Sequence, residues 1–426
     1  MTQAPAMPDV SPMPQASARP VAETERIATI DILRGFALFG ILTVNMYLFS
    51  NPFQNYLLPL DPNMPWYDRV GLWLVHFLTE GKFYTLFSLL FGLGFALQLQ
   101  RARARGGKFW TVYMRRLLVL LGFGLVHAFF IWIGDILVLY ALLGFVLLLF
   151  SKVKRPRTLL IWAGIFLAIP QVLSLALAAL IEFGRTVPEA AVQIEAAFVE
   201  QEAMFAQEAE RAREVYQTGS FLEITAQRAR DLQTMWLGTL TMAPTVLGMF
   251  LIGAYFGKRE IFADLAAHAT LFRRLVIWGF LIGIPANLYY AFAIMQVSRT
   301  IFGWDLAFAN LALAIGGVAQ SLAYLGSITL LSRRDPWQRP LSALAPVGQM
   351  GLSNYLLQSI IATLIFYSYG LGFFGQVGAA AGWLIAIAIY ATQIPLSHWW
   401  MRRFRYGPAE WLWRTLTYLR LQPMRR

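Results

Sequence analysis

Ten hydrophobic segments of membrane-spanning length divide this chain of 426 residues. A helix needs roughly 20 apolar residues to cross about 30 Å of hydrocarbon. The segments are 27–50, 82–100, 116–133, 135–151, 158–181, 236–257, 275–296, 306–332, 345–367 and 378–401. Because the bilayer core holds no water, the backbone of each segment must bond within a helix. The sequence therefore predicts an all-α, polytopic transmembrane helix bundle of about ten spans.

Lys and Arg fall almost wholly in alternate loops. The first loop, 51–66, has neither residue, whereas loop 101–116 carries six basic residues and no acid. The later basic clusters lie at 152–157, 258–259, 273–274, 333–339 and 402–405. All of them fall on one side of the predicted bundle. By the positive-inside rule this side is cytoplasmic, so we predict a multi-pass protein of the bacterial inner membrane with both termini in the cytoplasm.

Composition excludes several classes of protein. The chain is 58% hydrophobic and only 14% charged, which is too apolar for a soluble protein of this length. The net charge of +12 sits mainly in the predicted cytoplasmic loops, so we interpret it as an orientation signal and a contact for anionic lipid, not for nucleic acid. There are no cysteines, and the four histidines show no metal-binding spacing. We therefore expect neither a disulfide nor a metal site.

Five regions are predicted from these patterns. A Pro- and Ala-rich disordered cytoplasmic tail (1–25) precedes an N-terminal transmembrane bundle (26–181), in which 67–79 reads as an amphipathic helix on the outer face. Region 182–235 holds ten acidic and five basic residues and reads as an outer-face helical hairpin, with a capping box at Ser220–Glu223. The remaining regions are a C-terminal transmembrane domain, 236–405, and a basic cytoplasmic tail, 406–426.

Polar side chains at membrane depth are costly, and they carry the functional predictions. His127 lies towards the outer end of one span, and Asp135 follows in a tight outer turn. A carboxylate beside a histidine holds one tautomer and lets the imidazole act as a base near neutral pH. We predict that His127 and Asp135 are catalytic. The alternative is that His127 bonds to a backbone carbonyl or a Tyr hydroxyl within the bundle.

A second set of polar residues lies near the same outer surface or within the spans. The candidates for substrate binding are Asn45, Glu80, Lys82, Tyr140, Asn354 and Gln358. For the amides, a hydrogen bond between helices is the competing interpretation. At the opposite end, Asp31 and Arg34 are three residues apart and can pair on one helix face. The histidines at 76, 268 and 398 are interpreted as structural.

Several motifs together resemble the bacterial YeiB-like membrane proteins, a family defined by a domain of unknown function. The motifs are IDILRGFALFGIL at 30–42 with Asn45, GKF at 81–83, LFSLLFGLG at 86–94, LGF at 121–123 with His127, GDIL at 134–137 with Tyr140, GQMGLSNYLLQS at 348–359 and GLG at 370–372. The resemblance covers roughly 26–405. Gln349 departs from it, since an Arg is expected there.

The family is also distantly similar to membrane acyltransferases that include heparan-alpha-glucosaminide N-acetyltransferase, with which it shares an N-terminal Asp–Arg–Gly motif. That resemblance implies an acyl group moving from cytoplasmic acyl-CoA to a cell-envelope acceptor. It also implies that Asp31, Arg34, Arg115 and Arg116 contact the acyl-CoA. A small-molecule transporter or exporter, with the amides of 345–367 lining its path, is the rival class. The third class is a non-enzymatic, membrane-organising protein. The sequence does not decide whether copies of the chain associate into a homo-oligomer.

Overall fold

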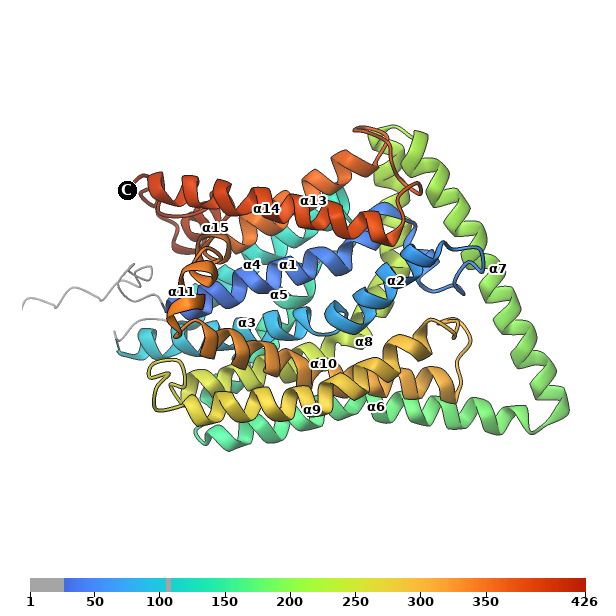
Figure 1. Cartoon of the computed structure of the whole chain (residues 1–426), viewed down its shortest axis with the longest axis horizontal. Helices are drawn as coiled ribbons and strands as arrows, with labels where there is room; N and C mark the ends of the chain where they lie inside the picture. Colours follow the sequence, from blue (N-terminus) through green and yellow to red (C-terminus); the bar gives the residue numbers. More distant parts are fainter. Residues whose placement is uncertain (1–26, 105–108) are drawn as a thin grey trace, which may run out of the picture.

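The computed structural model describes residues 27–104 and 109–426, which form helices joined by short loops (Figure 1). The predicted tail 1–25 and residues 105–108 of a basic loop lie outside this description. The helices are α1 Ala28–Ser50, α2 Trp66–Leu74, α3 Phe83–Ala104, α4 Phe109–Val126, α5 Leu137–Leu149, α6 Pro156–Arg185, α7 Pro188–Thr218, α8 Phe221–Lys258, α9 Ala269–Ile294, α10 Trp304–Leu331, α11 Asp335–Ser342, α12 Ala345–Gln349, α13 Gly351–Phe366, α14 Ala379–Arg403 and α15 Pro408–Tyr418. Between these helices lie two short 3-10 turns, η2 (Phe53–Tyr56) and η5 (Phe150–Lys152). Two π turns, η3 (Val75–Thr79) and η4 (His127–Ile131), follow α2 and α4.

The predicted all-α membrane bundle is confirmed. Within 27–104 and 109–426, eight stretches of helix are long and apolar enough to cross a bilayer, and two shorter apolar helices, Leu137–Lys152 and Gly351–Phe366, match the two remaining predicted spans. Many large apolar side chains face outward, as on α6, where Leu173 is 64% and Leu180 66% exposed. A soluble protein would bury such residues, so this surface contacts lipid. The chain is therefore a multi-pass membrane protein.

Helix α1 lies at the centre of the bundle and packs against α3, α10, α12, α13 and α14. Figure 1 shows the long helices running roughly along the long axis, with α9, α10 and α6 along one side and α13 and α14 along the other. The segment predicted as an outer amphipathic helix forms α2 and η3, and it is attached to α14. Asp68 Oδ1 accepts a hydrogen bond from the Ala380 N–H at 2.9 Å, and Trp383 Nε1 donates to the Gly71 carbonyl at 2.9 Å.

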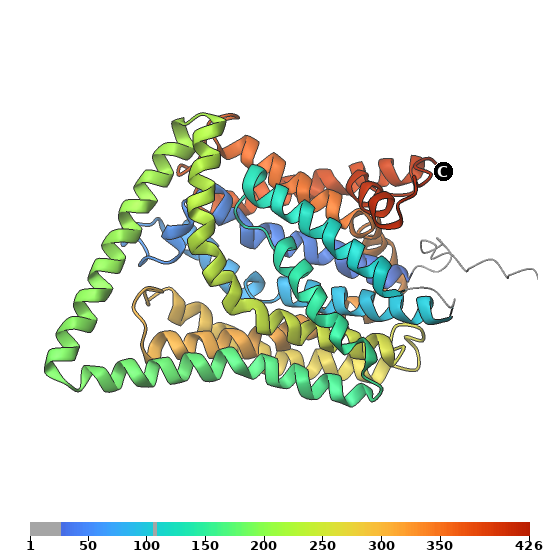
Figure 2. The ribbon, with the colours of Figure 1, turned by 180° about the vertical axis from the view of Figure 1, so that it is seen from behind.

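The acidic segment 182–235 covers the last turn of α6, all of α7 and the first part of α8. Seen from behind in Figure 2, α7 slants across one end of the bundle, from the end of α6 to the start of α8. The predicted capping box is confirmed, because the Ser220 hydroxyl accepts from the Glu223 N–H while the Glu223 carboxylate accepts from the Ser220 N–H. Tyr216 fastens α7 to α8 through a 2.8 Å hydrogen bond from its hydroxyl to Asp231. Since α8 runs unbroken past residue 235, the domain boundary there stays a prediction.

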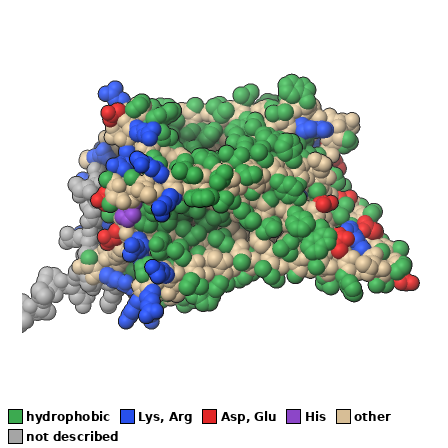
Figure 3. All heavy atoms as spheres, turned by 60° about the horizontal axis from the view of Figure 1, so that its bottom comes forward, with side chains coloured by type: hydrophobic (Ala, Val, Ile, Leu, Met, Phe, Trp, Pro, Cys, Tyr) green, Lys and Arg blue, Asp and Glu red, His purple; other side chains and the backbone are tan. Residues whose placement is uncertain are grey.

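Charge is distributed unevenly along the long axis. In Figure 3, Lys and Arg gather at one end of a broad apolar surface, and most acidic side chains gather at the other. The basic end is also where the chain finishes in Figure 1. The acidic end belongs to the region of α7 and the loops beside it. An excess of Lys and Arg at one end of the bundle is the pattern that the positive-inside rule describes for membrane proteins.

Helices α3 and α8 approach each other through two glycines. A Cβ added to Gly253 would lie 1.9 Å from the Leu89 carbonyl oxygen, and one added to Gly92 would lie 1.9 Å from the Phe250 carbonyl oxygen. No larger residue fits at either place without moving a helix backbone. Small residues of this kind let membrane helices pack closely. The close contact sets the position of α3, which contributes to the polar interior.

Candidate active site

The site begins where α4 widens into the π turn η4. His127 is the first residue of η4, and it is fully buried. Such turns add a residue to the helix and often occur at functional positions. After η4 the chain becomes extended at Trp132, which is also fully buried and stacks on Phe49 with 3.9 Å between ring centroids. The turn at 133–136 then leads directly into α5.

Asp135 lies in that turn and bonds to both sides of it. Its Oδ2 accepts the Val138 N–H at 2.7 Å, which satisfies one of the free donors at the start of α5. Its Oδ1 lies 2.9 Å from His127 Nδ1. The structure thus brings together the two residues predicted to be catalytic. Each side chain is 0% exposed.

A serine that the sequence did not single out completes the group. Ser359 Oγ on α13 lies 2.9 Å from His127 Nε2. When Nδ1–H donates to the Asp135 carboxylate, Nε2 is the nitrogen that accepts the Ser359 O–H, and the same hydroxyl lies 3.4 Å from the Tyr355 carbonyl oxygen. The order carboxylate, imidazole, hydroxyl is that of a nucleophile activated through a histidine. Because 232 positions separate Ser359 from His127, no local pattern points to their contact.

Hydrogen bonds at the start and in the middle of α13 hold it in place. Glu410 on α15 accepts the N–H groups of Leu352 and Ser353 at 2.6 and 3.1 Å and so caps α13. Burial raises the pKa of the Glu410 carboxyl, while these bonds favour its charged form. Along the helix, Gln358 donates to Gln393 Oε1 of α14 at 2.8 Å.

Two of the predicted substrate-binding amides therefore join helices. Asn354 donates to the Val347 carbonyl at 3.1 Å and to Ser397 Oγ at 3.0 Å, and it is 1% exposed. Gln358 is 2% exposed and bonds to α14 as described above. Both amide groups are used between α13 and its neighbours, which is the competing interpretation given above. Their bonds join α13, which carries Ser359, to α12 and α14.

Two other predicted residues, Tyr140 and Asn45, do not join this group. The Tyr140 hydroxyl lies 2.7 Å from Ser88 Oγ and donates to the Tyr84 carbonyl at 3.0 Å. Asn45 is half-buried on α1, and no hydrogen bond of its side chain occurs within 27–104 and 109–426. Neither residue contacts His127 or Asp135 through a hydrogen bond in these ranges.

Glu80 and Lys82 belong to a second buried cluster. Glu80 Oε1 is 3.3 Å from Arg299 Nη2, and the Glu80 carboxylate also bonds to His76 and to the Tyr56 hydroxyl. Lys82, which is 0% exposed, donates to the His76 carbonyl at 2.7 Å. The i, i+4 spacing of His76 and Glu80 is the local sequence feature that indicates this cluster, because it places both side chains on one helix face.

Arg299 and Tyr56 approach the second cluster from loops outside the spans. Burial raises the pKa of the Tyr56 hydroxyl. Burial alone would lower the pKa of Arg299, but Tyr290, Tyr56 and Glu80 outweigh it and raise that pKa. Arg299 therefore stays charged, and it stacks 3.9 Å above the Tyr56 ring. The cluster ties the loop between α9 and α10 to η2 and η3.

The residues predicted to contact acyl-CoA lie at the basic end. Arg34 donates to Asp31 Oδ1 at 3.0 Å, as their spacing predicted. The Arg116 guanidinium lies 3.7 Å from the centroid of the Trp413 ring, and the Arg115 Nε is buried with no partner in the described part of the chain. Arg116 precedes His127 by eleven residues, or about 16 Å of helix. The structure therefore places these four residues away from the His127 group.

The fold and the buried polar group define an α-helical, multi-pass membrane protein. The model of a family of proteins of unknown function, DUF418, matches residues 256–420. The chain is 38% identical to the uncharacterized protein YxaH of Bacillus subtilis, over 96% of this chain and 98% of YxaH. It is 31% identical to the uncharacterized protein YeiB of Escherichia coli, over 92% of this chain and 96% of YeiB. The chain therefore belongs to the YeiB-like family, and no solved structure matches it.

Proposed function

We propose that this protein is an acyltransferase of the bacterial inner membrane. The observation that carries the proposal is the hydrogen-bonded series Asp135–His127–Ser359, with both bonds to the imidazole at 2.9 Å. Such a series lets an imidazole take the proton of a hydroxyl that would otherwise be a weak nucleophile. In an apolar interior this arrangement is costly unless every polar atom is paired, and here both imidazole nitrogens are.

The proposed reaction has two steps. In the first, Ser359 Oγ attacks the thioester carbonyl of an acyl-CoA, His127 Nε2 takes the serine proton, and the CoA thiolate leaves with that proton. In the second, an acceptor hydroxyl or amine attacks the carbonyl of the acyl-serine, and His127 takes the proton of the acceptor. The bond between the acyl carbon and Ser359 Oγ then breaks, and the proton passes from His127 to Ser359. Asp135 holds the imidazole and stabilises its charged form in both steps. The acceptor is proposed to be a cell-envelope molecule.

The charge distribution supports this direction of transfer. The basic end, which contains Arg34, Arg115 and Arg116, suits a polyanionic cytoplasmic donor. His127 lies towards the other end of α4. The transporter alternative gains no support from Asn354 and Gln358, since both amides are bonded between helices.

Three variants test the proposal in purified protein. We expect Ser359→Ala and His127→Gln to lower acyl transfer by about 10²–10⁴-fold, and Asp135→Asn to be intermediate. Ser88→Ala is the matched control, because Ser88 is also a buried serine whose hydroxyl forms a hydrogen bond with an aromatic side chain, that of Tyr140. Melting temperature is measured on each variant. Mass spectrometry of wild type after donor alone should find the acyl group on Ser359.

Two results would contradict parts of this scheme. Wild-type turnover in His127→Gln would rule out a catalytic imidazole and favour a structural hydrogen bond. Wild-type turnover in Ser359→Ala, with loss in His127→Gln, would rule out the acyl-serine. It would make His127 the base that acts directly on the acceptor.

A further inference from the structure

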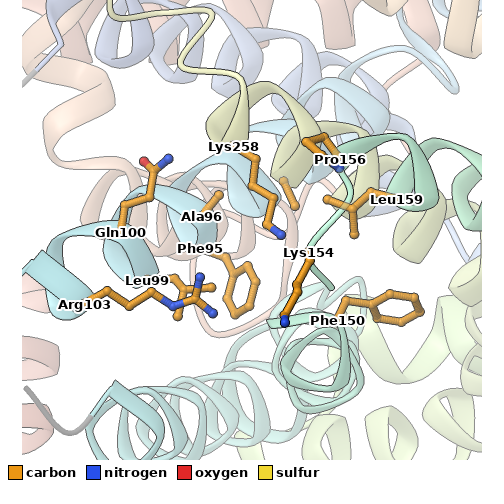
Figure 4. Close-up of a pocket in the computed structure, with 11 residues that line it drawn as sticks. Phe95, Ala96, Leu99, Gln100, Arg103, Phe150, Lys154, Pro156, Leu159 and Lys258 are labelled. Carbon is orange, nitrogen blue, oxygen red and sulfur yellow. The ribbon is translucent and has the colours of Figure 1, made fainter. Parts of the chain in front are cut away.

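A cavity of about 250 Å³ lies between α3, η5, the start of α6 and α8 (Figure 4). It is separate from the His127 group, because its lining comes from the C-terminal parts of α3 and α8, at the basic end. The lining residues are Phe95, Ala96, Leu99, Gln100, Arg103, Phe150, Lys154, Pro156, Leu159, Ala254 and Lys258. None of the functions considered so far uses it.

Three cations reach this cavity from three different elements. Figure 4 shows Arg103 coming from α3, Lys154 from the loop before α6 and Lys258 from α8. The lining contains no acidic residue. Arg103 Nη2 donates to the Ser151 carbonyl at 2.8 Å, and Lys258 donates to the Val153 carbonyl. These bonds hold the two side chains in place and leave further N–H donors for a ligand.

Lys154 lacks such an anchor. Its ammonium has no hydrogen bond or ion pair to any residue in the described ranges. Beside it, α6 begins at Pro156, which also lines the cavity. Pro156 has no N–H, and the Thr158 N–H donates to the Arg155 carbonyl at 3.1 Å, so this end acts mainly through the helix dipole, which makes it positive. A free cation and a helix start therefore add to the positive potential made by Arg103 and Lys258.

The rest of the lining is apolar and formed mainly by Phe95, Leu99 and Leu159, with Leu159 only 1% exposed. We propose that the cavity binds a phosphate group joined to an apolar chain. The cations and the start of α6 would hold the phosphate. The apolar wall would hold the first part of the chain. Both an anionic phospholipid and a long-chain CoA ester have this chemistry, and the inference does not depend on the proposed acyl transfer.

Binding to the purified full-length chain in phosphatidylcholine nanodiscs tests this inference. One arm titrates phosphatidylglycerol and the other titrates palmitoyl-CoA. We expect Lys154→Gln to weaken binding about tenfold in at least one arm. A tenfold loss of affinity is what the loss of one charge-assisted hydrogen bond would cause. Lys154→Arg should keep the affinity. Arg259→Gln is the matched control, since Arg259 is exposed beside Lys258 but does not line the cavity.

The two arms separate the sources of the ligand. A loss with phosphatidylglycerol alone assigns the cavity to membrane lipid, a loss with palmitoyl-CoA alone assigns it to the CoA ester, and a loss in both assigns it to the shared chemistry. Should Lys154→Gln unfold, Lys258→Gln replaces it. Equal affinities in all variants and both arms would overturn the inference. So would an equal loss in Arg259→Gln, because the attraction would then belong to the whole basic end.

Discussion

Glu80 and Arg299 form a buried ion pair whose members come from distant parts of the chain. Their side chains are only 11% and 18% exposed, and they lie 3.3 Å apart. Removing one charge from such a pair leaves the other buried without compensation. We therefore expect Glu80→Gln to lower the free energy of unfolding by about 3–5 kcal/mol, measured by denaturant unfolding in detergent.

The partly exposed pair Glu182–Arg185 is the control for this prediction. Its members are 31% and 26% exposed, and Arg185 also pairs with Glu195. Glu182→Gln should therefore change stability by no more than about 1 kcal/mol. The double variant Glu80→Gln/Arg299→Gln should lose less than the sum of its single changes. Additive losses would show that Glu80 and Arg299 do not depend on each other.

At the scale of helices, the contact of α3 with α8 depends on Gly253. Since a Cβ there would lie 1.9 Å from the Leu89 carbonyl oxygen, Gly253→Ala must push the helices apart. We expect a loss of about 1–3 kcal/mol in the free energy of unfolding. Gly238→Ala in the same helix is the control, because a Cβ there meets nothing within 4 Å.

The two alanine substitutions should have opposite signs. Alanine at position 238 should stabilise α8 by up to about 1 kcal/mol, since glycine is the poorer helix former. Both values come from the same thermal and denaturant unfolding curves. A Gly253→Ala variant as stable as Gly238→Ala would contradict the close contact.

At the scale of the whole molecule, the uneven charge predicts its orientation in the membrane. The chain has no cysteine, so single cysteines can be introduced as reporters. Glu210 on α7 has a side chain 72% exposed, and Arg334 is exposed at the basic end. We expect a membrane-impermeant maleimide added to intact cells, with the outer membrane made permeable, to label Glu210→Cys but not Arg334→Cys.

Lysing the cells should make both cysteines reactive, which serves as the control. The expectation follows from the positive-inside rule, which places the basic end in the cytoplasm and α7 outside. Labelling of both positions, or of Arg334→Cys alone, in intact cells would refute this orientation. It would also place the proposed acyl-CoA donor on the wrong side of the membrane.

The sequence by itself determined the features that depend on neighbouring residues. Apolar length identified the spans, the spacing of Asp31 and Arg34 predicted their pairing, and Ser220–Glu223 predicted a helix start. His127 and Asp135 could be paired because a short turn joins their helices. In each case the partners lie within about a dozen residues, so local geometry limits where they go.

Only the tertiary structure decided which helices face one another. In an apolar environment many helix faces are similar, and packing and a few polar contacts choose among them. That choice placed Ser359 beside His127, paired Glu80 with Arg299 and used Asn354 and Gln358 between helices. It also gathered Arg103, Lys154 and Lys258 around one cavity. Each of these contacts joins residues from different helices or loops, and no spacing along the chain encodes them.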